Sequence, residues 1–275
     1  MGFVSEQMQR LSSRATRRIG MYFGERFPFH YVCEYPKSGG TWLAKMLSDY
    51  LDAPFISHHS VMPVGCRSVI HSHWKYDRRL RRAVYLYRDG RDVMVSFYFQ
   101  RMLLLRQEPD APFCRMLRRR YDEAFGAGYD PDDVRSLLPR FIELEMLRPR
   151  TARLNWPDHI ANWWPGRGRH VHFVSYEQLR DDAAAAMTAC LEALGEAPVD
   201  APRVADTIRR HEFAAQTGRA PGDEDRNDFR RKGIVGDWKN HFTPEAARAF
   251  DRHAGDMLVR LGYEQDRSWV ERVAR

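Results

Sequence analysis

The stretch "YVCEYPKSGGTWLAKMLSDY" constrains the fold more than any other part of the chain. An apolar run stops at Pro36, which cannot donate to a strand ladder, and a helical pattern starts at Thr41. Between them, Gly39 and Gly40 let backbone N–H groups wrap inward, and the helix start adds free N–H groups and a positive dipole end. The pattern predicts an anion site with Lys37 as a point charge at its mouth. An ordinary glycine turn that caps a helix is the alternative.

The position of the lysine separates this loop from the common phosphate-binding loop. In a Walker loop the lysine follows the last glycine, whereas here Lys37 comes first.

The chain has 275 residues, enough for one large α/β domain or two small ones. Its 44 Lys and Arg against 37 Asp and Glu give a net charge of +7, which favours anionic ligands or surfaces.

The cysteines and the N-terminus bear on the compartment. Four scattered cysteines without a CxxC pair indicate reduced thiols, no zinc site and a cytoplasmic protein. No stretch approaches ~18 apolar residues, and the N-terminus lacks the apolar core of a signal peptide. Residues 1–29 are expected to form a basic helical segment. A solvated face is its plain interpretation, and peripheral membrane contact is the alternative.

Strand patterns alternate with helical patterns, which predicts an α/β fold with a P-loop-type central parallel β-sheet flanked by helices. We expect a single domain over residues 30–265, with a helical insertion at 106–155 and a mobile loop at 218–236. The expected strands are His30–Tyr35, Ser68–His71, Ala83–Tyr87 and His170–Ser175. The expected helices are Thr41–Leu51, Asp92–Leu105, Asp132–Leu147, Asp158–Trp164, Asp181–Leu194, Ala201–Thr217 and Pro244–Leu261.

Two further segments carry cations beside turn residues. In "AVYLYRDGRDVMVSFYF" a strand pattern ends at Arg88, and Asp92 is placed to cap the next helix, with Ser96 four residues later. A local ion pair between Arg88 and Asp92 would explain the same residues. In "FRRKGIVGDWKNHF" three cations precede Gly233, and such a loop can close on an anion. A solvated basic loop is the alternative there.

Five segments follow one another in a set order: "YPKSGGTW", "YRDGRDVMVSFYF", "WPDHIANWW", "FVSYEQL" and "FRRKGIVGDWKNHF". In this order they resemble the PAPS-dependent sulfotransferases of the cytosolic type, over residues 31–262 (PAPS is 3′-phosphoadenosine 5′-phosphosulfate). The resemblance implies a sulfotransferase that moves the sulfuryl group of PAPS to a hydroxyl of a small molecule, sugar or lipid-like acceptor, without a metal. Residues 106–150 match no family motif, and we expect the insertion on the acceptor side.

The resemblance also implies roles for single positions. Lys37 faces the oxygen that bridges phosphate and sulfate, where a cation stabilises the charge left on the departing nucleotide. The residues implied to hold the 5′-phosphosulfate are Lys37, Ser38, Gly39, Gly40, Thr41 and Trp42, the last of them near the adenine. Those implied for the 3′-phosphate are Arg88, Ser96 and a closing loop of Phe229, Arg230, Arg231, Lys232 and Gly233. Tyr176 and Phe213 are implied to line the adenine pocket, and helix core explains Phe213 equally well.

The general base is implied by a triplet. Where the family has Lys-Thr-His at a strand end, this chain has His71, Ser72 and His73. His73 then matches the base that takes the proton of the acceptor. His71 replaces the lysine, so a second cation near the sulfate is absent or depends on pH. If the strand continues that far, we expect the two histidines to point to opposite faces of it, with His71 as a helper to His73. His58 and His59 are a further pair near the expected acceptor side.

Two departures from the family pattern stand out. Gly40 occupies the place of a threonine, which removes one hydroxyl contact. In the pattern that family dimers use, Lys239 and Thr243 match, but Pro244 and Arg248 replace Val and Glu, so monomer and dimer both stay open.

A P-loop nucleotide kinase or NTPase is the alternative function, and it would need the Walker order and magnesium ligands. No nucleic-acid module is recognisable, and we expect no nucleic-acid partner.

Overall fold

The computed structural model describes residues 29–57 and 67–273, together with positions 8, 11, 12, 15, 18, 19 and 21–23. Most of the expected N-terminal segment, and both His58 and His59, lie outside the described residues. The chain divides into two compact units, the first made of residues up to 88 and 160–218, the second of residues 89–159 and from 219 onward. The α/β class is confirmed.

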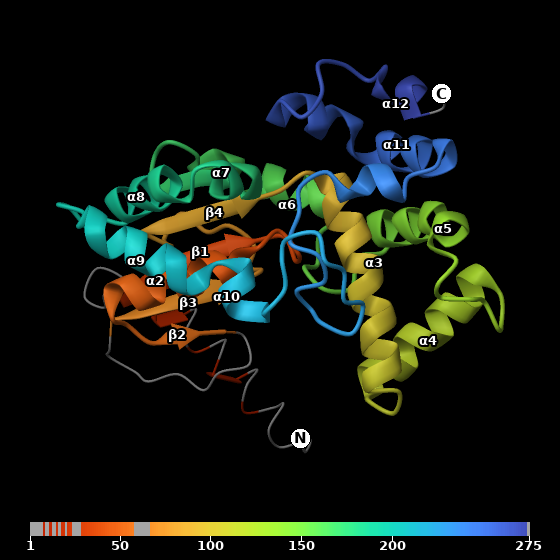
Figure 1. Cartoon of the computed structure of the whole chain (residues 1–275), viewed down its shortest axis with the longest axis horizontal. Coiled ribbons are helices and arrows are strands. Elements are labelled where there is room, and N and C mark those ends of the chain that lie inside the picture. Colours follow the sequence, from red (N-terminus) through yellow and green to blue (C-terminus); the bar gives the residue numbers. More distant parts are fainter. Residues whose placement is uncertain are drawn as a thin grey trace. The chain divides into compact units, whose positions relative to one another are not determined.

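The first unit is built on a five-stranded parallel sheet in the order β2-β3-β1-β4-β5 (Figure 1). The strands are β1 Phe29–Glu34, β2 Phe55–Ile56, β3 Ser68–Ser72, β4 Ala83–Tyr87 and β5 Val171–Ser175. All six residues of β1 are buried, as expected of a central strand in a parallel sheet covered on both faces. The four expected strands are confirmed, and β2 was missed because two residues are too short to show a pattern.

The helices of the first unit cover one face of this sheet. They are α2 Gly40–Leu51, α7 Tyr176–Asp181, α8 Ala183–Ala193, α9 Ala201–His211 and α10 Phe213–Thr217. Val32, Val69 and Val84 pack against α2 and α8 in one apolar cluster. On the opposite face Trp163 stacks on Tyr85 with ring centroids 5.3 Å apart, next to the short helix η1 Trp164–Gly166.

Two helix boundaries of the first unit differ from expectation. A capping box at Ser175, whose hydroxyl accepts from Gln178 N–H while the Gln178 side chain accepts from Ser175 N–H, starts α7 before the expected helix. Asp182 then caps the separate helix α8. The single helix expected over 201–217 is broken at Glu212, whose ψ of 149° is extended.

The second unit is helical. Its elements are α3 Gly90–Gln107, α4 Pro112–Phe125, α5 Val134–Leu147, η2 Asp237–Asn240, α11 Pro244–Leu261 and α12 Trp269–Val273, and α6 Trp156–Trp163 crosses the division between the units. Both α4 and α5 fall in the expected insertion. In the described part of the chain, no helix has the length and apolarity of a membrane span.

The start of α3 corrects one prediction. Asp89 is the cap, because its side chain accepts from Arg91 N–H, and the helix begins two residues earlier than expected. Asp92 lies inside the first turn instead, and its carboxylate accepts from the N–H groups of Gly236 (2.8 Å) and Trp238 (2.9 Å). Asp92 therefore ties the segment before η2 to α3.

Candidate active site

The loop between β1 and α2 is curled by two residues in the left-handed region. Lys37 has a φ of 73° and Gly39 a φ of 103°, on either side of Ser38. Gly39 is also required by contact, since a Cβ there would lie 2.7 Å from a ring carbon of Tyr176. Alternating backbone of this kind turns N–H groups toward one concave side, which is the geometry of an anion-binding nest.

The loop offers hydrogen-bond donors that the described part of the chain does not use. Within it, neither Gly39 N–H nor Thr41 N–H has an acceptor, and the buried Ser38 hydroxyl has no partner. Gly40 N–H differs, because it donates to the carboxylate of Glu34. The remaining donors fit a phosphate or sulfate group, whose oxygens only accept.

Aromatic and cationic side chains stand beside the loop. The rings of Trp42 and Tyr176 meet edge to face with centroids 6.0 Å apart, and the Arg88 guanidinium lies 4.3 Å from the centre of the Tyr176 ring. Trp42 Nε1 donates to the carbonyl of His211 at 2.9 Å, at the end of α9. Phe213 follows two residues later in α10, a helix with no buried residue. The structure therefore argues against helix core as the role of Phe213.

A second cluster stands at the ends of the neighbouring strands β1 and β3. The register pairs Val32 with His71, so Glu34 and His73, each two residues further on, share that side of the sheet. The rings of His71 and His73 are 5.1 Å apart. The expectation that these histidines point to opposite faces is wrong, because residues two apart in extended backbone point the same way.

Glu34 holds both histidines. His71 Nε2 donates to Glu34 Oε1 at 3.0 Å, and His73 Nδ1 donates to the backbone carbonyl of Glu34 at 3.1 Å, since a carbonyl only accepts. Burial alone would raise the pKa of Glu34, but the hydrogen bond and charge of His71, the charge of His73 and the N–H of Gly40 lower it on balance. Glu34 is therefore an ionised carboxylate at neutral pH.

The same cluster has the composition of a metal site. Each of Glu34, His71 and His73 offers one donor atom, and these atoms lie within 4.8 Å of one another. The Glu34 carboxylate already accepts from His71 and from Gly40 N–H. Hydrogen bonds among its own members and to the loop thus hold the arrangement together.

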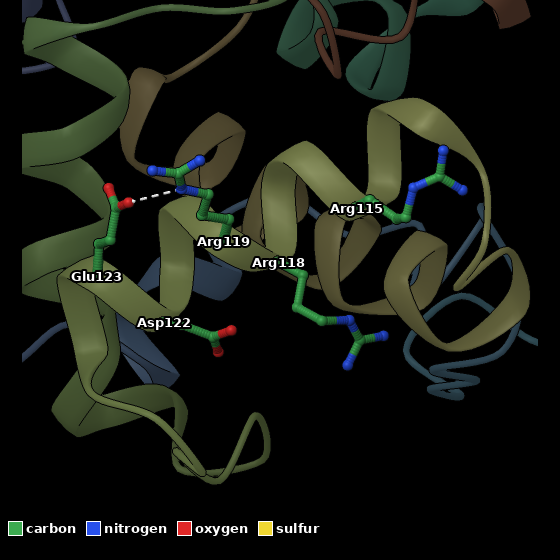
Figure 2. A pocket seen from close by; sticks show the side chains of 5 residues that line it. All are labelled: Arg115, Arg118, Arg119, Asp122 and Glu123. Atoms are coloured by element: carbon green, nitrogen blue, oxygen red, sulfur yellow. Dashed lines mark hydrogen bonds and ion pairs between the residues drawn. The ribbon is translucent and has the colours of Figure 1, made fainter.

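The other predicted residues belong to the second unit. Ser96 is half-buried on α3 between buried neighbours. In the loop, Phe229 and Arg230 are exposed, whereas Arg231 and Lys232 form ion pairs with Asp237. The shallow hollow that Figure 2 shows on α4 contains none of the predicted residues; it is lined by Arg115, Arg118, Arg119, Asp122 and Glu123.

Two residues of these clusters were missed by sequence reasoning. Glu34 carried a signal, because it is an acidic residue inside an otherwise apolar strand, directly before the loop. Asp237 lies in the segment "FRRKGIVGDWKNHF", but sequence reasoning assigned it no role. His58 and His59, expected near the acceptor, lie outside the described residues.

Comparison with known proteins places the chain in a family. The sulfotransferase domain family matches residues 67–262, which is more than half of the chain. The chain therefore belongs to the sulfotransferase domain family, and the resemblance seen in its motifs is confirmed. The match begins after the Lys37 loop.

Individual relatives are distant. Sulfotransferase 1E1 of Bos taurus is 27% identical over 221 residues, which cover 76% of this chain and 63% of that protein. Sulfotransferase 2B1 of Homo sapiens is 24% identical over 259 residues, 81% of this chain and 64% of that protein. The chain thus spans somewhat less than two thirds of these relatives.

Solved structures share the fold. Mouse sulfotransferase SULT7A1 complexed with PAP (3′-phosphoadenosine 5′-phosphate) has a TM-score of 0.64 at 22% identity, with 95% of this chain and 93% of that chain covered. Retinol dehydratase in complex with androsterone and the inactive cofactor PAP has a TM-score of 0.60 at 15% identity, with 89% and 85% covered.

Proposed function

We propose that the protein transfers a sulfuryl group from PAPS to a hydroxyl acceptor. The observation that carries this proposal is the juxtaposition of an anion-binding loop and a histidine pair at the ends of two adjacent parallel strands, β1 and β3. In open α/β sheets, ligands bind at this edge. Both similar structures are complexes with PAP, which supports a nucleotide of that kind.

The residues of the first unit fit the donor. The Ser38 hydroxyl and the N–H groups of Gly39 and Thr41 would hold its 5′-phosphosulfate, for which the described residues supply no competing acceptor. Trp42 and Tyr176 offer ring faces and edges for an adenine. Roles for Arg88 and Phe213, and for Ser96 and the 229–233 loop, stay predictions from the resemblance, as do the oligomeric state, the location and any membrane contact.

The chain's own groups divide the chemistry between them. PAPS supplies the sulfuryl group. His73, with a proton on Nδ1 held toward the Glu34 carbonyl, carries its lone pair on Nε2 and can take the acceptor's proton there. Lys37, at the mouth of the loop, stabilises the negative charge that develops on the departing nucleotide.

Binding of PAP against ADP tests the proposal. A site that recognises a 3′-phosphate should bind PAP at least ~10-fold more tightly than ADP, because PAP carries a phosphate at the 3′ position and ADP does not. Titration calorimetry of the whole chain measures both constants. Equal affinities would remove the proposal. If PAP binds more tightly, a screen of hydroxyl compounds with radiolabelled PAPS would identify the acceptor.

Removal of divalent metals separates the proposal from the kinase alternative. Lys37 and the loop N–H groups supply the positive charge that Mg²⁺ supplies in a kinase. Sulfuryl transfer should therefore persist in excess EDTA, within about 2-fold of the untreated rate. An absolute requirement for Mg²⁺, with turnover of ATP, would favour the P-loop kinase or NTPase instead.

A further inference from the structure

One buried acidic residue joins three parts of the candidate site. Glu34, at the end of β1, is 3% exposed. One carboxylate oxygen accepts from Gly40 N–H at the start of α2, and the other accepts from His71 Nε2 at 3.0 Å. Its backbone carbonyl accepts from His73 Nδ1 at 3.1 Å. The loop, His71 and His73 thus all hydrogen-bond to one residue.

A buried carboxylate beside an anion-binding loop needs compensation. Uncompensated, its negative charge would repel a phosphate or sulfate, and burying it would be costly. Two N–H donors, from His71 and from the N-terminal end of α2, supply that compensation. Since the carboxylate oxygens are engaged from both sides, His71 is held as a donor to Glu34 and the loop is held against the strand end.

Gly40 is the steric partner of this carboxylate. A Cβ at position 40 would lie 2.5 Å from the Glu34 carboxyl carbon and 2.9 Å from Oε1. Both are shorter than any real contact of a Cβ. With the Glu34 carboxylate in this place, position 40 has no room for a Cβ, which gives a physical reason for the absence of threonine at this point of the loop.

We propose that Glu34 is a positioning residue for sulfuryl transfer, matched to Gly40, which acts through His71 and through the placement of the loop. This inference rests on the proposed function. It adds to that function a residue whose side chain touches neither donor nor acceptor but sets the groups that do.

Turnover in a double-mutant cycle tests the action through His71. Glu34→Gln keeps the shape of the side chain but not its charge, so kcat should fall ~10-fold or more while the affinity for PAP stays within about 3-fold, as is typical of groups that orient a functional histidine. In a His71→Ala background, Glu34→Gln should cost less than about 2-fold. Glu192→Gln, an exposed change of the same kind on α8, should leave kcat unchanged.

Two results would overturn this part of the proposal. One is full turnover in Glu34→Gln. The other is an equal loss from Glu34→Gln in the wild-type and His71→Ala backgrounds, because a merely structural carboxylate would act independently of His71.

A second cycle tests the match with Gly40 and does not require activity. Gly40→Ala should lower the thermal unfolding midpoint by several degrees, because the methyl group overlaps the Glu34 carboxylate. In a Glu34→Ala background the same change should have little further effect. Equal shifts in both backgrounds would contradict the match. If wild-type protein fails to prefer PAP over ADP, the proposed function fails, while this thermal cycle still reports on the pair.

Discussion

Two loops of this chain are candidates for binding anions, and they are built in opposite ways. The loop between β1 and α2 lies between a buried strand and a core helix, and its donors are backbone N–H groups and the hydroxyl of Ser38. The 218–236 loop has no helix or strand of its own. It is held by side chains: Arg219 donates to the Asp228 carboxylate and to the carbonyls of Arg230 and Arg231.

The cations of the second loop are already committed. Arg231 and Lys232 both pair with the carboxylate of Asp237, which is 3% exposed. An anion that binds these cations must compete with Asp237, whereas an anion at the first loop meets donors without partners in the described chain. The fold thus provides one candidate site whose donors are available in advance and one candidate site whose cations must exchange partners.

Loss of the base should give the largest effect in the first unit. We expect His73→Ala to lower turnover by ~10²–10⁴, which is typical of a general base, while PAP still binds, because the proposed nucleotide contacts lie elsewhere. Single-turnover kinetics and calorimetry separate the two quantities. His253→Ala, which removes a histidine paired with Glu143 in the second unit, is the control and should keep its activity. Near-native turnover in His73→Ala would mean that the chemistry is not at the end of β3.

The next effect concerns stability in the second unit. Asp237→Asn leaves Arg231 and Lys232 without their buried carboxylate and should cost about 2–4 kcal/mol of unfolding free energy, measured in urea. Asp228→Asn, in the same loop but with a more exposed carboxylate, should cost less than about 1 kcal/mol. Equal losses would show that Asp237 does not organise these cations.

The contribution of Asp237 to the stability of the fold should also depend on pH. Burial alone would raise its pKa, but the nearby imidazole of His241 and hydrogen bonds from Lys232, Arg231 and Asn240 hold the pKa far below its usual range. Because the pKa is lower in the folded than in the unfolded chain, the stabilisation is present above roughly pH 4 and is lost as the pH falls further. The stability difference between wild type and Asp237→Asn should therefore shrink between pH 7 and pH 3.

The smallest effect is expected for loop dynamics. If the cations of the 218–236 loop exchange Asp237 for a nucleotide phosphate, saturating PAP should slow hydrogen exchange of its amides about tenfold. Amides of α11 serve as the internal reference and should not change. Unchanged hydrogen exchange in the 218–236 loop would mean that, of these two loops, only the β1–α2 loop contacts the nucleotide.

Most of the fold could be predicted from local patterns, because buried parallel strands and amphipathic helices are visible in a single sequence. What failed depends on contacts between distant residues. The cap of α3 is Asp89 and not Asp92, whose carboxylate instead accepts from the N–H groups of Gly236 and Trp238. The anion loop was recognised from its glycines and lysine, but the hydrogen bond of Gly40 to Glu34 depends on how a strand end meets a helix start, which no spacing rule states.

The 2.5 Å overlap between a Cβ at position 40 and the carboxyl carbon of Glu34 also restricts the order in which this loop can change. While the carboxylate at position 34 is present, a larger residue at position 40 must displace it, so the cost of each change depends on the other. A mutational path from this loop to one with threonine at position 40 is therefore less costly when Glu34 is lost first. Libraries made from this chain should accordingly favour variants in which positions 34 and 40 change together or in that order.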